Sequence, residues 1–211
     1  MSQSYTHYHD IMLPVILGES GVIYLRSTNQ KRLFAKKRAM YLKRAISKYN
    51  QIQTILVGNT LIETRKTTSF SMEIEFDHFV LSLRSCVEHL MQLINFVANL
   101  HLSPTSYDRV SRVDADNVIS RLKNTHNTVL CRLAAYLDKE KGKDWYKTLH
   151  KLRIEIYHNK FDKFSAQGQQ IKLELPNHIK MDLTTYCNLV SVNVERILTF
   201  SSKSLVEFLG L

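Results

Sequence analysis

The sequence has few of the residues that end helices or make tight turns. It contains six glycines and three prolines in 211 residues, and no stretch rich in proline, glycine or serine divides it. Because these residues interrupt helices and supply most turns, their scarcity favours long helices over many short strands. We therefore expect one all-α domain, since a chain of this length can bury a single well-packed core.

The sequence also lacks paired cysteines and long apolar runs. Cys86, Cys131 and Cys187 lie far apart in apolar helical patterns, without the spacing of a zinc site or a disulfide framework. No apolar run approaches the roughly 20 residues that a membrane span requires, and the N-terminus has no signal-peptide pattern. We interpret the chain as a cytoplasmic protein with reduced cysteines and no membrane partner.

Motifs for cofactors and metal ions are absent as well. The sequence has no glycine-rich phosphate loop, no cluster with metal-ligand spacing, and no helical acidic pair suited to two-metal or glycosidic chemistry. We expect neither a metal nor a cofactor. Most enzyme classes therefore receive no support.

Acidic residues are missing from one long segment of a chain whose formal net charge is +10. Residues 20–62 contain no aspartate or glutamate but many lysines and arginines. Such a block attracts a polyanion by counterion release, so nucleic acid is the first partner to consider. A solvated basic helix face without a ligand is the alternative. The predicted nucleic-acid-binding residues are Arg32, Lys36, Lys37, Lys43, Arg44, Lys147, Lys151 and Lys160.

Apolar spacing predicts an all-α bundle of about five helices with at most a small β-hairpin. Residues 1–28 contain two β-favouring runs, which we expect to form a hairpin or an extended arm before a single helical domain of residues 29–211. The alternating residues 170–175 predict a strand that would need residues 12–25 to form a sheet. The predicted helices cover residues 29–57, 71–101, 115–139, 144–160 and 182–208.

In two of these helices, the spacing predicts which side chains face the core and which face solvent. In the helix of 29–57, the spacing of Leu33, Phe34 and Met40 predicts that these side chains face the core. In the helix of 71–101, Asp77 and Arg84 belong to a polar stripe that we expect to be solvated.

The segment Asp144–Asn159 combines a core pattern with a candidate active site. At about 100° per residue, one side of this helix carries Trp145, Leu149, Leu152 and Ile156. The other side carries Tyr146, His150, Ile154 and Tyr157. A helix that is apolar on both sides either lies centrally or contacts a partner subunit, and we predict a symmetric homodimer with its two-fold axis near Ile154 and Tyr157.

The end of this segment resembles the signature of a known superfamily. Arg153-Ile-Glu-Ile-Tyr-His158 is an R-x4-H motif near a helix end in a basic, helical chain. It is similar to the hallmark of the HEPN superfamily, whose members are commonly metal-independent ribonucleases of toxin, antiviral and CRISPR-associated systems. The resemblance implies a composite active site at a homodimer seam, with Arg153 and His158 as the catalytic residues. It also implies an antitoxin or another defence-system component as a further partner.

The chemistry suits these residue types. Metal-independent RNA cleavage needs a base for the 2′-OH proton, an acid for the leaving 5′-oxygen and a cation for the phosphorane. Arg153 can bind phosphate with two N–H groups, and His158 can transfer protons near neutral pH. Because their side chains diverge by about 140° on one helix, two copies of the chain would bring them together. His150, Tyr157 and Asn159 are supporting candidates.

Three alternatives stay open. Ile154 stands where the family usually has a polar residue, which leaves room for a catalytically inactive HEPN-like module that binds nucleic acid or nucleotide, or serves as a scaffold. Arg153 could instead pair with Glu155 or Asp144 while His158 caps a helix end, a purely structural role. A helical adaptor that applies its basic helix to a protein or an acidic membrane surface is the third alternative.

Overall fold

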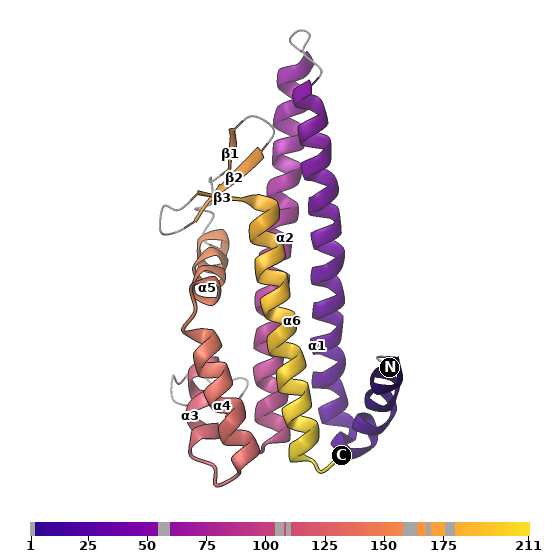
Figure 1. The fold of residues 1–211 in the computed structure, drawn as a ribbon, viewed down its shortest axis with the longest axis vertical. Coiled ribbons are helices and arrows are strands. Elements are labelled where there is room, and N and C mark those ends of the chain that lie inside the picture. Colours follow the sequence, from indigo (N-terminus) through magenta and orange to yellow (C-terminus); the bar gives the residue numbers. More distant parts are fainter. Residues whose placement is uncertain are drawn as a thin grey trace. The chain divides into compact units, whose positions relative to one another are not determined.

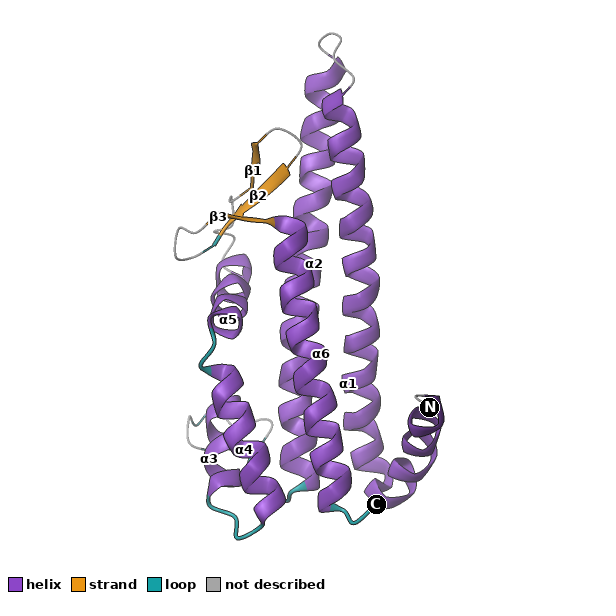
Figure 2. Ribbon diagram, viewed as in Figure 1, coloured by secondary structure: helices purple, strands orange, loops and turns teal. Residues whose placement is uncertain are grey.

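The computed structural model describes residues 3–54, 60–103, 108, 111–157, 164–167, 170–175 and 180–211. Side-chain surroundings are described for 21–48, 71–103, 108, 111–157, 164, 171–175 and 180–211. The described helices are α1 (Gln3–Thr54), α2 (Thr60–Val97), α3 (Ala115–Lys123), α4 (Thr128–Lys141), α5 (Asp144–Tyr157) and α6 (Leu183–Phe208), shown in Figure 1. The strands are β1 (Phe164–Gln167), β2 (Gln170–Glu174) and β3 (Lys180–Asp182). Figure 2 shows how strongly helix predominates, which confirms the predicted all-α class.

The sheet is a local antiparallel meander in the order β1-β2-β3. Leu173 of β2 pairs with Phe164 on one side and with Met181 on the other. Ile171, Leu173 and Leu175 are buried, as the alternating pattern predicts. The predicted strand is therefore confirmed, whereas its predicted pairing with residues 12–25 is wrong.

The N-terminal segment is helical, so the predicted hairpin or arm over residues 1–28 is wrong. Helix α1 has 52 residues and continues through the predicted boundary at residue 28. The β-favouring runs in this segment are short, and local propensity of this kind is a weak signal that tertiary context overrides.

The predicted helix of 115–139 is divided into α3 and α4. The Asp114 carboxylate caps α3 by accepting a hydrogen bond of 2.9 Å from the Asn117 N–H. The Asn127 side chain caps α4 by accepting bonds from the N–H groups of Val129 and Leu130, at 3.0 and 3.1 Å. Asparagine and threonine favour caps over helix interiors, so the run Asn-Thr-His-Asn at 124–127 was the signal for this break.

Contacts divide the chain into two compact units. Unit 1 contains Met1–Lys31, Cys86–Glu140 and Arg196–Leu211, and unit 2 contains Arg32–Ser85 and Lys141–Glu195. Every boundary lies inside a helix, so the units are not successive segments joined by linkers. The single domain of residues 29–211 stays a prediction.

Aromatic pairs join helices within unit 1. The rings of Tyr136 on α4 and Phe200 on α6 stack with their centroids 3.9 Å apart. Tyr24 on α1 lies 5.7 Å from Phe96 on α2. Such pairs contribute about 0.5–1.5 kcal/mol beyond the burial of their surface, so they reinforce the core that these helices share.

In unit 2, the Phe76 ring of α2 is fully buried between a strand and a helix. It meets Phe164 of β1 edge-on at 5.3 Å and Tyr186 of α6 at 6.1 Å between centroids. One ring thus contacts both the sheet and α6, which positions the start of α6 in this unit.

The buried side of α1 differs from the predicted one. Thr28, Ala35 and Leu42, seven residues apart, are at most 5% exposed. Leu33 is 65% exposed, and Phe34 and Met40 are also exposed, so their predicted inward orientation is wrong. Apolar residues are numerous enough on this helix to define two stripes at helical spacing, and packing uses the one with smaller side chains.

The two leucines of α1 provide a matched test of this orientation. Leu42→Ala removes a side chain that is 1% exposed and should lower the free energy of unfolding by about 2–5 kcal/mol. Leu33→Ala should change it by less than about 0.5 kcal/mol. Urea denaturation of both variants measures the difference, and equal losses would contradict the observed orientation.

Candidate functional site

Helix α5 carries Arg153, the first residue of the R-x4-H motif, and packs as its sequence predicts. The Lys143 carbonyl accepts hydrogen bonds from the N–H groups of Tyr146 and Lys147, which starts the helix at the predicted residue. The buried side of α5 contains Trp145, Leu149, Leu152 and Ile156. The core stripe of the prediction is therefore confirmed, and it determines which side chains of α5 face outward.

The opposite side of α5 is more exposed than buried. His150 is exposed, Ile154 is 39% exposed and Tyr157 is 73% exposed. Tyr146, predicted on this side, is buried, and its hydroxyl accepts a hydrogen bond of 3.0 Å from Arg84 of α2. The polar stripe of α2 that includes Arg84 is thus half-buried rather than solvated.

Arg153 is half-buried and has no acidic partner among the residues that the structure describes. Its guanidinium carbon lies 5.6 Å from the centroid of the Tyr157 ring, in a cation–π contact. The alternative pairing with Glu155 or Asp144 does not occur. A cation–π contact at an exposed ring is worth about 0.5–1 kcal/mol, which leaves the guanidinium N–H groups able to bind a stronger acceptor.

The other half of the motif lies outside the described residues. Helix α5 is described to Tyr157, and His158, Asn159 and Lys160 follow it. Their proposed roles stay predictions.

Acids from other helices neutralise part of the basic segment of α1. Arg32 donates to both carboxylate oxygens of Glu195 at 2.9 Å, and Lys36 lies 3.2 Å from the same carboxylate. Burial alone would raise the pKa of Glu195, but the hydrogen bonds and charges of Arg32 and Lys36 outweigh burial and lower it. Arg38 pairs with Glu75 of α2 at 3.1 Å.

The remaining predicted nucleic-acid-binding residues of α1 and α5 are exposed. Lys37, Lys43 and Arg44 on α1 form no ion pair with an acid in the described parts of the chain. The same holds for Lys147 and Lys151 on α5. These five cations, rather than Arg32 and Lys36, are therefore the residues best placed to contact an external anion.

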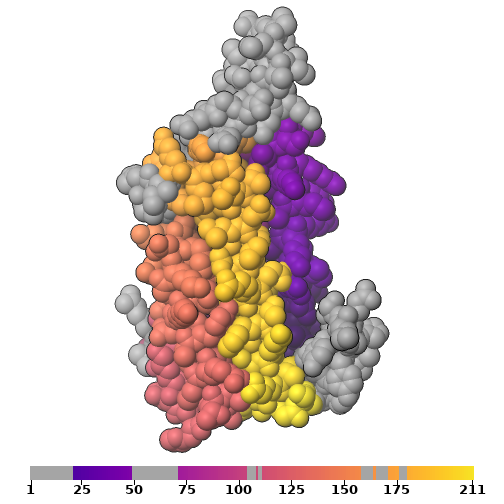
Figure 3. Space-filling view, in the orientation of Figure 1, coloured from indigo at the N-terminus to yellow at the C-terminus, as the bar shows by residue number. Residues whose placement is uncertain are grey.

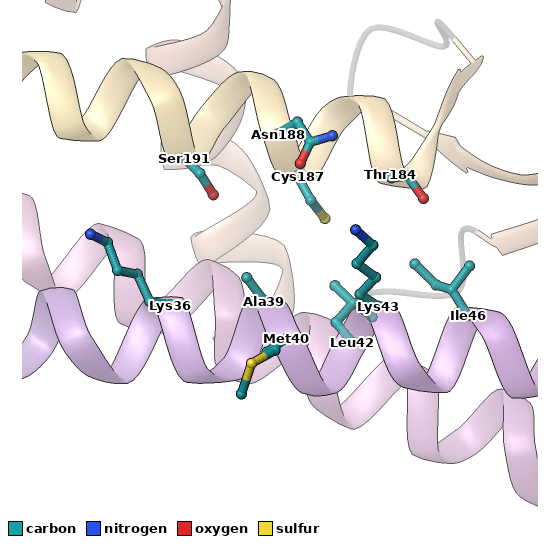
Figure 4. A pocket seen from close by; sticks show the side chains of 10 residues that line it. All are labelled: Lys36, Ala39, Met40, Leu42, Lys43, Ile46, Thr184, Cys187, Asn188 and Ser191. Atoms are coloured by element: carbon teal, nitrogen blue, oxygen red, sulfur yellow. The ribbon is translucent and has the colours of Figure 1, made fainter.

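Within unit 2, a groove of about 190 Å³ lies between α1 and the first turns of α6. Figure 3 shows the side chains of these two helices adjoining on one face. Its lining residues are Lys36, Ala39, Met40, Leu42, Lys43 and Ile46 of α1 and Thr184, Cys187, Asn188 and Ser191 of α6, shown in Figure 4.

The polar groove residues of α6 were missed at the sequence level. Thr184, Asn188 and Ser191 recur at intervals of four and three residues, which places them on one side of a helix. This spacing was the available signal. Cys187 lies between them, and burial, followed by the nearby Asp182 carboxylate, raises the pKa of its thiol well above the usual range. The thiol therefore lines the groove as a neutral group.

Asp77 of α2 is a half-buried carboxyl group. Burial, followed by repulsion from Glu73, raises its pKa from 3.8 to about 6. One of its carboxyl oxygens is buried and accepts no hydrogen bond from the described residues. The charged form of Asp77 is thus disfavoured in the folded chain.

Comparisons with protein-family models, with curated proteins and with solved structures gave no match. Of the helices in the described ranges, none combines the length and the apolar character needed to cross a membrane. Function is therefore inferred from the residues of α1, α5 and α6.

Asp77→Asn should remove a pH dependence of stability. Between about pH 4 and pH 6 the folded state holds a proton on Asp77 that the unfolded state releases, so the stability that Asp77 contributes falls as pH rises. The asparagine variant should gain stability relative to the wild type as pH rises through this window. Urea denaturation at pH 4, 5, 6 and 7 measures this difference, and a constant offset would contradict the prediction.

Proposed function

We propose that the chain is a metal-independent endoribonuclease of the toxin or defence type that acts as a homodimer. The observation that carries this proposal is Arg153, whose guanidinium rests on the exposed Tyr157 ring without an acidic partner in the described residues. The R-x4-H resemblance to the HEPN superfamily and the exposed cations support it further. An antitoxin or another defence component is the inhibitory or activating partner that such a nuclease would need.

In the proposed reaction, Arg153 and His158 have separate roles. His158 accepts the 2′-OH proton, and the 2′-oxygen attacks the adjacent phosphorus while the 5′-oxygen leaves with a proton. Arg153 stabilises the charge of the phosphorane, since hydrogen bonds to charged groups are worth about 1.5–3 kcal/mol and exceed its contact with Tyr157. The products are a 2′,3′-cyclic phosphate and a 5′-hydroxyl, and His150 is the candidate acid for the leaving oxygen.

The proposed homodimer rests on the same helix. If the helix continued through His158, residues five apart would diverge by about 140°, and the Arg153 and His158 side chains of one copy would not enclose one phosphate. Ile154 and Tyr157 form an exposed apolar surface beside Arg153. A symmetric contact between two such surfaces would bury them and bring both copies of the motif together.

The exposed lysines and Arg44 of α1, with Lys147 and Lys151 of α5, would hold the RNA backbone. Lysine and arginine side chains of this kind contact phosphates rather than base edges. Binding should therefore show little sequence preference and should weaken steeply with salt.

A second candidate is a catalytically inactive RNA-binding module. It is favoured by Ile154, an exposed apolar residue directly after Arg153, where the family usually has a polar one. RNA binding without cleavage would identify this function.

Cleavage in EDTA tests the proposed chemistry. Arg153→Ala and His158→Ala should each slow RNA cleavage by at least about 100-fold, because each removes a group that acts in the transition state. DNA, which has no 2′-hydroxyl, should survive. Gel assays with analysis of the product ends measure both results.

Two exposed residues outside the motif supply matched controls for this assay. Arg121→Ala on α3 and His126→Ala before α4 change the same residue types and should leave the rate unchanged. Full cleavage by both motif variants, or a requirement for added magnesium, would exclude Arg153 and His158 from the reaction.

Tyr157→Asp should convert the dimer to a monomer. The change places a charge on a side chain that is 73% exposed in the chain alone and would be desolvated in the proposed interface. Light scattering at micromolar concentration measures the mass. Leu33→Asp, on an exposed position of α1, should remain dimeric, and a wild-type monomer would refute the interface.

A further inference from the structure

We infer that the groove between α1 and α6 is a binding site for a phosphate group, separate from the R-x4-H motif. Lys43 lies on α1, and Thr184, Asn188 and Ser191 lie on α6, all lining the same groove. Figure 4 shows the Lys43 side chain extending from α1 toward Thr184 and Cys187 of α6. Ammonium, hydroxyl and amide groups from two facing helices are donors that suit phosphate oxygens.

The charge in and around the groove is positive. Lys43 has no acidic partner in the described residues. The described lining contains two lysines, Lys36 and Lys43, and no acid, and Lys36 shares the Glu195 carboxylate with Arg32. The neighbouring Asp182 carboxylate accepts hydrogen bonds from the N–H and hydroxyl groups of Thr185, at 2.9 and 3.1 Å. An anion in the groove would therefore meet more positive than negative charge.

The donors of the site are side chains rather than the helix end. Asp182 caps the first turn of α6 by binding the Thr185 N–H. Thr184, Asn188 and Ser191 present their polar groups over two turns toward α1, as Figure 4 shows. The neutral Cys187 thiol between them adds no negative charge that would repel a phosphate.

The volume of the groove limits what can enter it. Pockets that enclose a whole small molecule measure about 300–1,000 Å³, whereas this groove measures about 190 Å³. The groove therefore has room for a phosphate group but does not enclose a whole small molecule. The basic segment of α1 attracts polyanions, so the proposed source of the phosphate is a polynucleotide, through either a backbone phosphodiester or a terminal 5′-phosphate.

A titration with inorganic phosphate at pH 7, followed by NMR amide shifts, tests the site on the full chain. The wild type should show saturable shifts at residues 184–191 and around Lys43. Lys43→Gln should weaken phosphate binding by about tenfold or more, since it removes a charge-assisted hydrogen bond. Lys37→Gln makes the same charge change on an exposed residue of α1 outside the groove and should change binding by less than about threefold.

Glu195→Gln should change the affinity for phosphate in the opposite direction. It leaves Arg32 and Lys36 without their shared carboxylate and should strengthen phosphate binding several-fold. Equal losses for Lys43→Gln and Lys37→Gln would overturn the site, because they would indicate general attraction by α1. Shifts that do not saturate, or that spread over the chain, would overturn it as well.

Two DNA oligonucleotides of one sequence, with and without a 5′-phosphate, identify the source of the phosphate. DNA resists the proposed cleavage, so this measurement does not depend on nuclease activity. Preference for the phosphorylated end would support a terminal phosphate, and equal binding that still requires Lys43 would support a backbone phosphate. Loss of cleavage in Arg153→Ala with retained phosphate binding would separate this site from the proposed active site.

Discussion

Residues 20–54 of helix α1 contain nine cations and no acid, and the acids that balance part of this charge come from other helices. Glu195 of α6 holds Arg32 and Lys36, and Glu75 of α2 holds Arg38. Partly exposed ion pairs of this kind contribute only about 0–1 kcal/mol each. Burial of apolar side chains such as Leu42 therefore supplies the stability, while the ion pairs match α1 to its neighbours in unit 2.

The same charge distribution shapes the surfaces proposed to bind RNA. Arg38 pairs with Glu75, and Arg32 and Lys36 share Glu195. Lys37 and Arg44 are exposed and form no ion pair with an acid in the described residues. Lys43 shares a feature with each group. It forms no ion pair with an acid in the described residues, yet it faces another helix, α6, across the groove. A segment that reads as one basic block thus contains residues with different electrostatic surroundings.

Much of this fold could be predicted from residue spacing. The core stripe of α5, including Leu149 and Leu152, follows directly from helical periodicity. Helical periodicity also placed two residues of the candidate site, Arg153 and the exposed Tyr157, on α5. The break between α3 and α4 was missed because periodicity continues across it, and only the capping side chain of Asn127 marks it.

The sequence by itself determined the all-α class, the location of the strand at residues 170–175, the buried side of α5 and the concentration of positive charge in α1. Tertiary structure alone decided which stripe of α1 is buried, which of its cations meet Glu195 and Glu75, and that Lys43 faces Thr184 and Asn188. The physical reason is the range of the interactions. Periodicity acts within one helix, whereas the Arg32–Glu195 ion pair and the groove join residues more than 100 positions apart, and their pairing depends on how the helices pack.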